Sequence, residues 1–266
     1  MVQSPMVFIL RYQPARSLLL LMVMSLSGCS TPPSPESHPS NSPLSESPRL
    51  GVQGGLSDSR PSTPEAGGIV SLPGGVVCDR TRLQVLVPGE VAIDVGFLEQ
   101  VACIRGTREH EALVVVACRP SDVHTALLLL GLEPGRPGGW NYSETNVSRV
   151  PPEGDRIRVG VRFVDESGAV QEHPISSWLV GEPGERPFPE QPWIFGGSII
   201  DEGSGHYRAD SSGSLIGLVT FGDEVLGLES VIADSIEVDA AEWQVRTFLV
   251  PPPGTPVQLV FSPWVE

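Results

Sequence analysis

The segment Glu109-His110-Glu111, together with His124 fourteen residues after His110, holds the side chains of this sequence best suited to chemistry. Two imidazoles and a carboxylate suit zinc or a similar divalent ion, because these groups are common zinc ligands in proteins. The same groups also suit general acid or base catalysis. A structural role is the third interpretation, in which both histidines hydrogen-bond loop backbone and fix the docking of a helix. The sequence favours that role, because Glu-His-Glu is not the metal motif His-Glu-x-x-His, which is absent here.

The element that must position His124 is a helix at about residues 121–131. Ser121 is the expected N-cap, Asp122 supplies an acid in the first turn, and Gly131 follows the end. The partial positive charge at the helix start disfavours a protonated His124, which leaves the ring neutral and able to ligate a metal. The apolar face that should pack on a sheet follows the i, i+3, i+4, i+7 rule and comprises Val123, Ala126, Leu127 and Leu130.

Short runs rich in Val, Ile and Leu surround this helix and predict a mostly β fold. Residues 156–163 alternate, with apolar side chains on one face and arginines on the other, so this strand should be half buried. A turn at residues 165–168 should lead into a strand at 169–173, and Pro-Gly pairs, including Pro88-Gly89, mark further turns. Other strands are expected at 83–87, 91–95, 112–118, 193–200, 214–221, 244–250 and 257–261. We therefore predict an α+β fold, mainly antiparallel β with one prominent helix packed on the sheet.

The beginning of the sequence has the parts of an export signal. Arg11 and Arg16 precede an apolar run at residues 17–26, which is about half of the roughly 20 apolar residues that a bilayer-spanning helix needs. Leu26-Ser27-Gly28-Cys29 then resembles a bacterial lipobox, and the resemblance implies cleavage before Cys29 and attachment of lipid to its thiol. The alternative is an ordinary secretory signal with a cysteine at the cleavage site.

Composition divides the rest of the chain. Residues 29–70 are rich in Ser and Pro and have isolated apolar residues, so they cannot bury a core and should form a disordered tether. Residues 71–266 are long enough for a single globular domain. The three predicted parts are thus a lipoprotein signal peptide at 1–28, a lipidated tether at 29–70 and a globular domain at 71–266.

The net charge of the chain limits the classes of molecule that it can bind. The formal net charge is −15, and removal of residues 1–28 with their two arginines would make it about −17. So acidic a chain is a poor partner for nucleic acid.

Beyond Cys29 the sequence holds Cys78, Cys103 and Cys118, an odd number that allows one disulfide and one free thiol without fixing the pairing. A nucleophilic pair of Cys103 with His110 is also conceivable.

Several separated blocks resemble the YdjY-like family, uncharacterised bacterial proteins of planctomycete type. These blocks are Gly106 to Ala112, Ala117 to Ser121, His124 to Leu128, Trp193 to Ser198, Tyr207 to Asp210 and Pro253 to Val257. The family has no established activity, so the resemblance implies no mechanism. Some relatives carry a cysteine cluster suggestive of iron-sulfur binding, which this chain lacks.

Two functions follow from these observations. The first, which we favour, is a non-enzymatic envelope lipoprotein that is held to membrane lipid through Cys29 and presents a mainly β binding or structural module to an envelope protein or small ligand. It should lie in the cell envelope, facing the periplasm or the cell surface. The second is a small metal-binding or metal-dependent envelope enzyme that uses Glu109, His110, Glu111 and His124.

Overall fold

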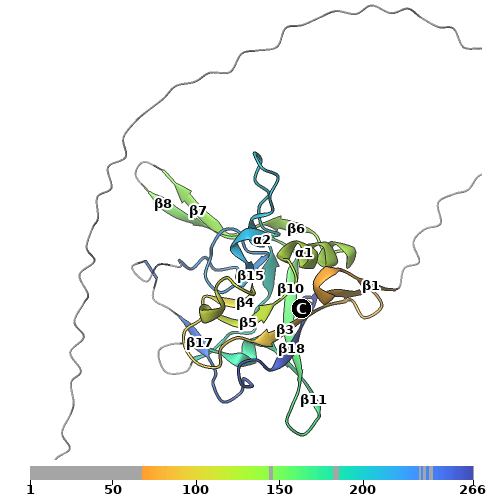
Figure 1. Cartoon of the computed structure of the whole chain (residues 1–266). Coiled ribbons are helices and arrows are strands. Elements are labelled where there is room, and N and C mark those ends of the chain that lie inside the picture. The colour runs from red at the N-terminus through yellow and green to blue at the C-terminus, as the bar shows by residue number, and fades with distance from the viewer. Residues whose placement is uncertain are drawn as a thin grey trace, which may run out of the picture. The chain divides into compact units, whose positions relative to one another are not determined.

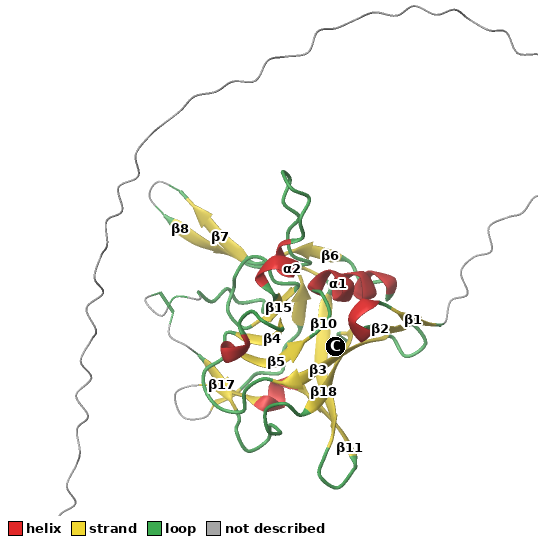
Figure 2. Ribbon diagram, viewed as in Figure 1, coloured by secondary structure: helices red, strands yellow, loops and turns green. Residues whose placement is uncertain are grey.

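The structure is a computed structural model that describes residues 68–143, 146–181, 186–233, 235, 238–239 and 242–265. The predicted signal peptide and the tether up to residue 67, including Cys29, lie outside the described residues. The described chain is dominated by β-strands (Figures 1 and 2). No helix in these ranges is long and apolar enough to cross a membrane.

Eight strands form a closed β-barrel. In the order in which they pair, they are β3 (Gln84–Val91), β18 (Pro256–Pro263), β10 (Arg156–Val164), β14 (Trp193–Phe195), β16 (Leu226–Gly227), β15 (Ser214–Gly217), β4 (Gln100–Ile104) and β5 (Ala112–Val116). Strand β5 returns to pair with β3, which closes the ring. Two neighbouring pairs, β15 with β16 and β4 with β5, are parallel, and the other pairs of the ring are antiparallel.

The closing contact depends on Gly89 of β3. A Cβ atom at this position would lie 2.8 Å from the carbonyl oxygen of Val115 in β5, closer than real Cβ contacts allow. Glycine therefore lets the two strands approach. The expectation of a turn at Pro88-Gly89, with separate strands on either side, is wrong, because β3 runs through both residues to Val91.

The alternation of residues 156–163 is confirmed, and it separates the inside of the barrel from the outside. Ile157, Val159 and Val161 of β10 are buried in the hydrophobic core. Their neighbours Arg158 and Arg162 lie on the opposite face of the strand. The predicted hairpin is also confirmed, since β10 continues through the turn into β11 (Val170–Pro174).

The prediction of an α+β fold, mainly antiparallel β with one prominent helix packed on the sheet, is wrong. The sheet is closed, and the described chain has only two α-helices, α1 (Pro120–Leu129) and the five-residue α2 (Arg208–Ser212). Helix α1 begins with Pro120 at its first position rather than with a Ser121 cap, since Arg119 is the N-cap. The closure of the sheet was not predicted, because it depends on strand pairings between distant segments. Local hydrophobic periodicity does not encode such pairings.

Short elements extend the barrel. Strands β1 (Ile69–Ser71) and β2 (Val77–Asp79) continue the sheet beyond β3. Smaller sheets are β12 (Leu179–Gly181) with β13 (Arg186–Pro187) and β17 (Trp243–Val245), β6 (Pro134–Arg136) with β9 (Glu153–Gly154), and β7 (Gly139–Tyr142) with β8 (Val147–Val150). Single 3-10 turns are η1 (Pro73–Gly75), η2 (Glu109–Glu111) and η3 (Ile175–Trp178). The β7–β8 hairpin projects away from the barrel (Figure 2).

Candidate functional site

Glu109, His110 and Glu111 form the 3-10 turn η2, which leads into β5. Glu109 accepts a hydrogen bond from the backbone N–H of Gly106 at 2.8 Å. The Nε2 atom of His110 lies 3.7 Å from a carboxylate oxygen of Glu111, and the His110 side chain is 74 % exposed. The segment is therefore a solvated surface turn in which only His110 and Glu111 contact each other.

His124 lies on α1 and has a different set of partners. Its Nδ1 atom lies 2.8 Å from the Tyr207 hydroxyl and 3.0 Å from the carbonyl oxygen of Gly197. Tyr207 donates its own proton to the same Gly197 oxygen at 2.9 Å. The Gly197 carbonyl can only accept a hydrogen bond, so its contact with the ring is satisfied when Nδ1 carries the proton, and that tautomer leaves a lone pair on Nε2.

The surroundings of His124 favour the neutral ring. The imidazole packs edge-on against Phe195, with ring centroids 5.0 Å apart. Burial lowers the pKa of His124 below its usual value of 6.5, and the Gly197 carbonyl opposes this shift only in part. At neutral pH His124 therefore carries no charge and holds the backbone at Gly197.

The four predicted site residues do not form one group. His110 meets Glu111, whereas the partners of His124 come from residues 195–207. Within the described ranges, the structure has no group of three or more His, Cys, Asp or Glu side chains that could hold a metal ion. Metal binding by Glu109, His110, Glu111 and His124 stays a prediction.

The three cysteines beyond the tether are free and buried. Burial is the largest cause that raises the pKa of each thiol, and it raises that of Cys118 to about 12. Because the thiolate is the nucleophile, protonated thiols in apolar surroundings are unreactive. Cys78, Cys103 and Cys118 thus have the character of small core residues, and the described chain holds no disulfide between them.

A hollow that the sequence did not predict lies on the outer wall of the barrel. It has a volume of about 270 Å³ and is shared by β3, β18, β10, β11 and the loop before β14. Its lining consists of Gln84, Arg158, Gly160, Glu172, His173, Pro174, Glu190, Val260 and Ser262. Gly160 leaves the floor open, since it stands between Val260 and Pro174 in the register of three strands and has no side chain.

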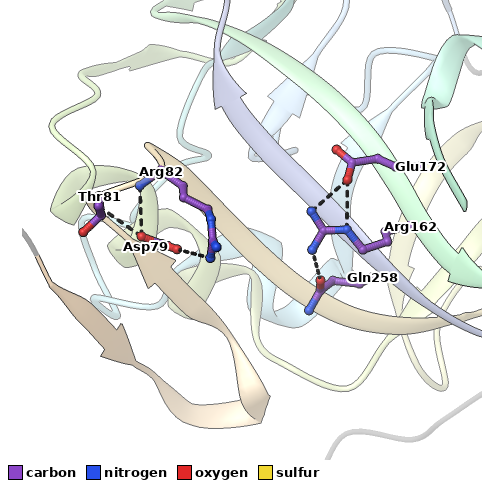
Figure 3. Close-up of polar contacts among 6 residues, drawn as sticks. All are labelled: Asp79, Thr81, Arg82, Arg162, Glu172 and Gln258. Atoms are coloured by element: carbon purple, nitrogen blue, oxygen red, sulfur yellow. Dashed lines mark hydrogen bonds and ion pairs between the residues drawn. The ribbon is translucent and has the colours of Figure 1, made fainter. Parts of the chain in front are cut away.

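A row of polar side chains bounds the hollow on one side. Arg162 stands across from Glu172 on β11 and from Gln258 on β18, and it bonds both (Figure 3). Its guanidinium lies 2.9 and 2.8 Å from the same Glu172 oxygen through two nitrogens. This pairing neutralises Glu172, which lines the hollow, and holds the carboxylate in place.

A turn fixes the opposite side of the hollow. The Asp79 carboxylate at the end of β2 accepts hydrogen bonds from the backbone N–H groups of Thr81 and Arg82, each at 3.0 Å. It also accepts one from the Arg82 guanidinium at 3.3 Å (Figure 3). The backbone hydrogen bond from Arg82 is the largest cause that lowers the pKa of Asp79. The ionised carboxylate therefore orders the turn that delivers Gln84 to the start of β3.

Two charged side chains on the lining, Arg158 and Glu190, have no partner of opposite charge among the described residues. The Arg158 guanidinium lies over the ring of Trp264, 5.0 Å from its centroid, which restrains its direction. Arg158, Pro174 and Glu190 also line an adjoining hollow of about 20 Å³. These two charges stand where the two hollows meet.

The YdjY domain family matches residues 76–262 of this chain, which is more than two thirds of its length. The chain belongs to the YdjY family. No curated protein and no solved structure matches it.

In this YdjY protein the matched region holds the eight barrel strands, except for the last residue of β18, and all the lining residues of the larger hollow. Sequence reasoning missed the hollow because its charged residues, Arg158, Glu172 and Glu190, follow no motif. The available signal was the run of arginines on the polar face of residues 156–163, interrupted by Gly160. That interruption is what opens the floor.

Proposed function

We propose that this YdjY protein is an envelope lipoprotein whose barrel binds a small ligand. Residues 1–28 act as a signal peptide, Cys29 carries the lipid, and the segment from residue 30 to the start of β1 holds the domain away from the membrane surface. The support for the anchor is the order of basic, apolar and small residues that ends in Leu26-Ser27-Gly28-Cys29, followed by a Ser/Pro-rich stretch. The protein then resides in the cell envelope, facing the periplasm or the cell surface.

One observation carries the binding role, the hollow on the barrel wall with two unpaired charges on its lining. Buried core side chains fill the interior of this barrel, so its outer wall and loops are the surfaces left for recognition. The four residues predicted for metal binding or catalysis do not form one group in the described chain, whereas the hollow brings charged, polar and apolar residues together on its lining. A non-enzymatic binding module is the function that this geometry supports best.

Mass spectrometry of the protein expressed in a bacterial host tests the anchor. The mature N-terminus should be Cys29 with diacylglyceryl and acyl groups, and the protein should fractionate with membranes. Cys29→Ser should abolish lipidation and membrane association, while the matched variant Ser30→Ala should keep both. An unmodified Cys29, or a mature N-terminus elsewhere, would show that the anchor is absent.

A metal-dependent envelope enzyme is the second candidate, and the state of His124 favours it. The network at Nδ1 leaves a neutral imidazole with its Nε2 lone pair available, which is the form that ligates metal. Further ligands would have to come from a substrate or partner that purifies with the chain. Elemental analysis of the purified full chain tests this candidate: bound metal should be stoichiometric in the wild type and lost in His124→Ala, and a metal-free wild type contradicts it.

A further inference from the structure

The charged side chains on and beside the hollow sum to zero, but not all of them form ion pairs. Of its three residues of fixed charge, Glu172 is neutralised by Arg162 from the neighbouring row. Arg158 and Glu190 remain, one positive and one negative, and neither forms an ion pair or hydrogen bond with another described residue. A ligand that fits this lining needs one charge of each sign.

The arrangement disfavours ligands of a single charge. A simple anion on Arg158 would stand beside the carboxylate of Glu190 and within the field of a chain with net charge −15. A simple cation on Glu190 would face the guanidinium of Arg158. A molecule that bears both a carboxylate and an ammonium group satisfies both side chains and gains a charge-assisted hydrogen bond at each end.

The size of the hollow limits the ligand further. About 270 Å³ corresponds to roughly nine water-sized groups at ~30 Å³ each, which lies just below the range of about 300–1,000 Å³ for pockets that hold drug-sized molecules. The adjoining hollow of about 20 Å³ is smaller than one such group, so it adds little room for the ligand. Free amino acids of medium size, such as leucine and aspartate, have about this number of non-hydrogen atoms.

The remaining lining is suited to orient such a molecule. Arg158 is held over Trp264, so its guanidinium loses little freedom when a carboxylate binds. Gln84 and Ser262 add neutral donors and acceptors beside the open floor at Gly160. A planar guanidinium matches a carboxylate through two parallel hydrogen bonds, which gives geometric selectivity.

We infer that the hollow is a binding site for a free amino acid, whose carboxylate pairs with Arg158 and whose ammonium group pairs with Glu190. The inference rests on the proposed binding function and names its ligand class. No covalent step is involved.

Saturation-transfer NMR and calorimetry on the purified full chain, at pH 7.5 and low salt, test the site. The probes are the twenty protein amino acids and D-alanine, with acetate and methylammonium as single-charge fragments. At least one amino acid should bind, and each fragment should bind about 100-fold more weakly or not at all. Arg158→Gln and Glu190→Gln should each weaken amino acid binding about 10-fold or more.

Matched variants separate the site from the general loss of charge. Arg246→Gln removes an exposed cation after β17, and Glu166→Gln removes an anion from the β10–β11 turn; neither residue lines the hollow or contacts a residue that the argument uses. Both should keep the wild-type affinity. Equal weakening by these controls would overturn the site assignment.

Two negative results have different meanings. If no amino acid binds but acetate or another single-charge probe binds in a way that depends on Arg158, the ligand class inferred here is wrong while the binding function stands. If neither the amino acids nor a broad set of small polar metabolites binds the folded protein, the proposed binding function is itself overturned.

Discussion

The carboxylate of Glu224 turns back on its own loop and accepts the backbone N–H of Gly222 at 2.8 Å. The same oxygen accepts the N–H groups of Phe221 and Asp223, each at 3.1 Å. Glu224 is only 2 % exposed. Burial raises the pKa of this carboxyl to about 7, although the hydrogen bonds from the loop oppose the shift.

This buried acid should make stability depend on pH. Because its pKa is raised on folding, the folded chain keeps the proton between pH 4.5 and about 7, where the unfolded chain has released it. The contribution of Glu224 is therefore most favourable below pH 4.5, falls as the pH rises to about 7 and is constant above that. At 1.36 kcal/mol per pKa unit the fall amounts to roughly 3 kcal/mol.

Urea unfolding of the wild type and Glu224→Gln from pH 4.5 to 8 measures this term. The difference in unfolding free energy between the two proteins should change by roughly 3 kcal/mol in favour of the variant as the pH rises. Glu166→Gln, at an exposed turn, serves as the control and should show no such trend. A pH-independent difference for Glu224→Gln would contradict the raised pKa.

Gln100 should be a destabilising residue. It lies on the same face of β4 as the core residue Ala102, is 0 % exposed, and neither amide atom has a hydrogen-bond partner in the described chain. Gln100→Met keeps the volume and removes an unsatisfied polar group, so it should raise the free energy of unfolding by about 1–3 kcal/mol. Gln84→Met on the half-buried outer face should change it by less than about 0.5 kcal/mol. A destabilised Gln100→Met would indicate that an internal partner bonds the amide.

Gly154 should tolerate no side chain. Its φ is +138°, and a Cβ atom would lie 2.0 Å from the carbonyl oxygen of Phe195, so backbone must move. Gly154→Ala should cost about 3 kcal/mol or more, measured by thermal or denaturant unfolding. Gly168→Ala, at φ +83° in open space, meets only the conformational penalty of about 1–2 kcal/mol. Similar losses for both variants would remove the steric explanation.

His124 should titrate below pH 6.5 in the folded protein, since burial lowers its pKa. Its side-chain NMR signals should report that midpoint directly. The unfolded chain then binds the proton more readily, so the contribution of His124 to stability is lost as the pH falls below 6.5. Tyr207→Phe removes the hydroxyl that bonds both the Gly197 carbonyl and His124 Nδ1, so it should cost about 1–3 kcal/mol. A midpoint above 6.5 would indicate a charged partner instead.

Local patterns predicted local structure well. The alternation of residues 156–163 anticipated β10, its buried face and the hairpin to β11, because a strand with one buried face must repeat every second residue. Helix α1 was anticipated within a residue or two at each end. The Ser121 cap was not, because its hydroxyl bonds Asp210, 89 residues away.

Distant pairings were beyond these patterns. Closure of the barrel needs β3 to meet β5 and β18, and nothing in the period of any one strand specifies its neighbour. The partners of His124 lie 73 and 83 residues along the chain. Likewise, Arg158 and Glu190 reach the same hollow from different elements, so no spacing rule could join them.

The position of β18 in the ring determines when the barrel can close during synthesis of the chain. This strand, residues 256–263, lies between β3 and β10, so the ring has a gap until the last part of the described chain has been synthesised. Contacts this far apart in sequence make folding slow, on the order of milliseconds to seconds. A nascent chain would therefore expose the edges of β3 and β10 throughout its synthesis, and a truncated chain would keep them exposed as sites of aggregation.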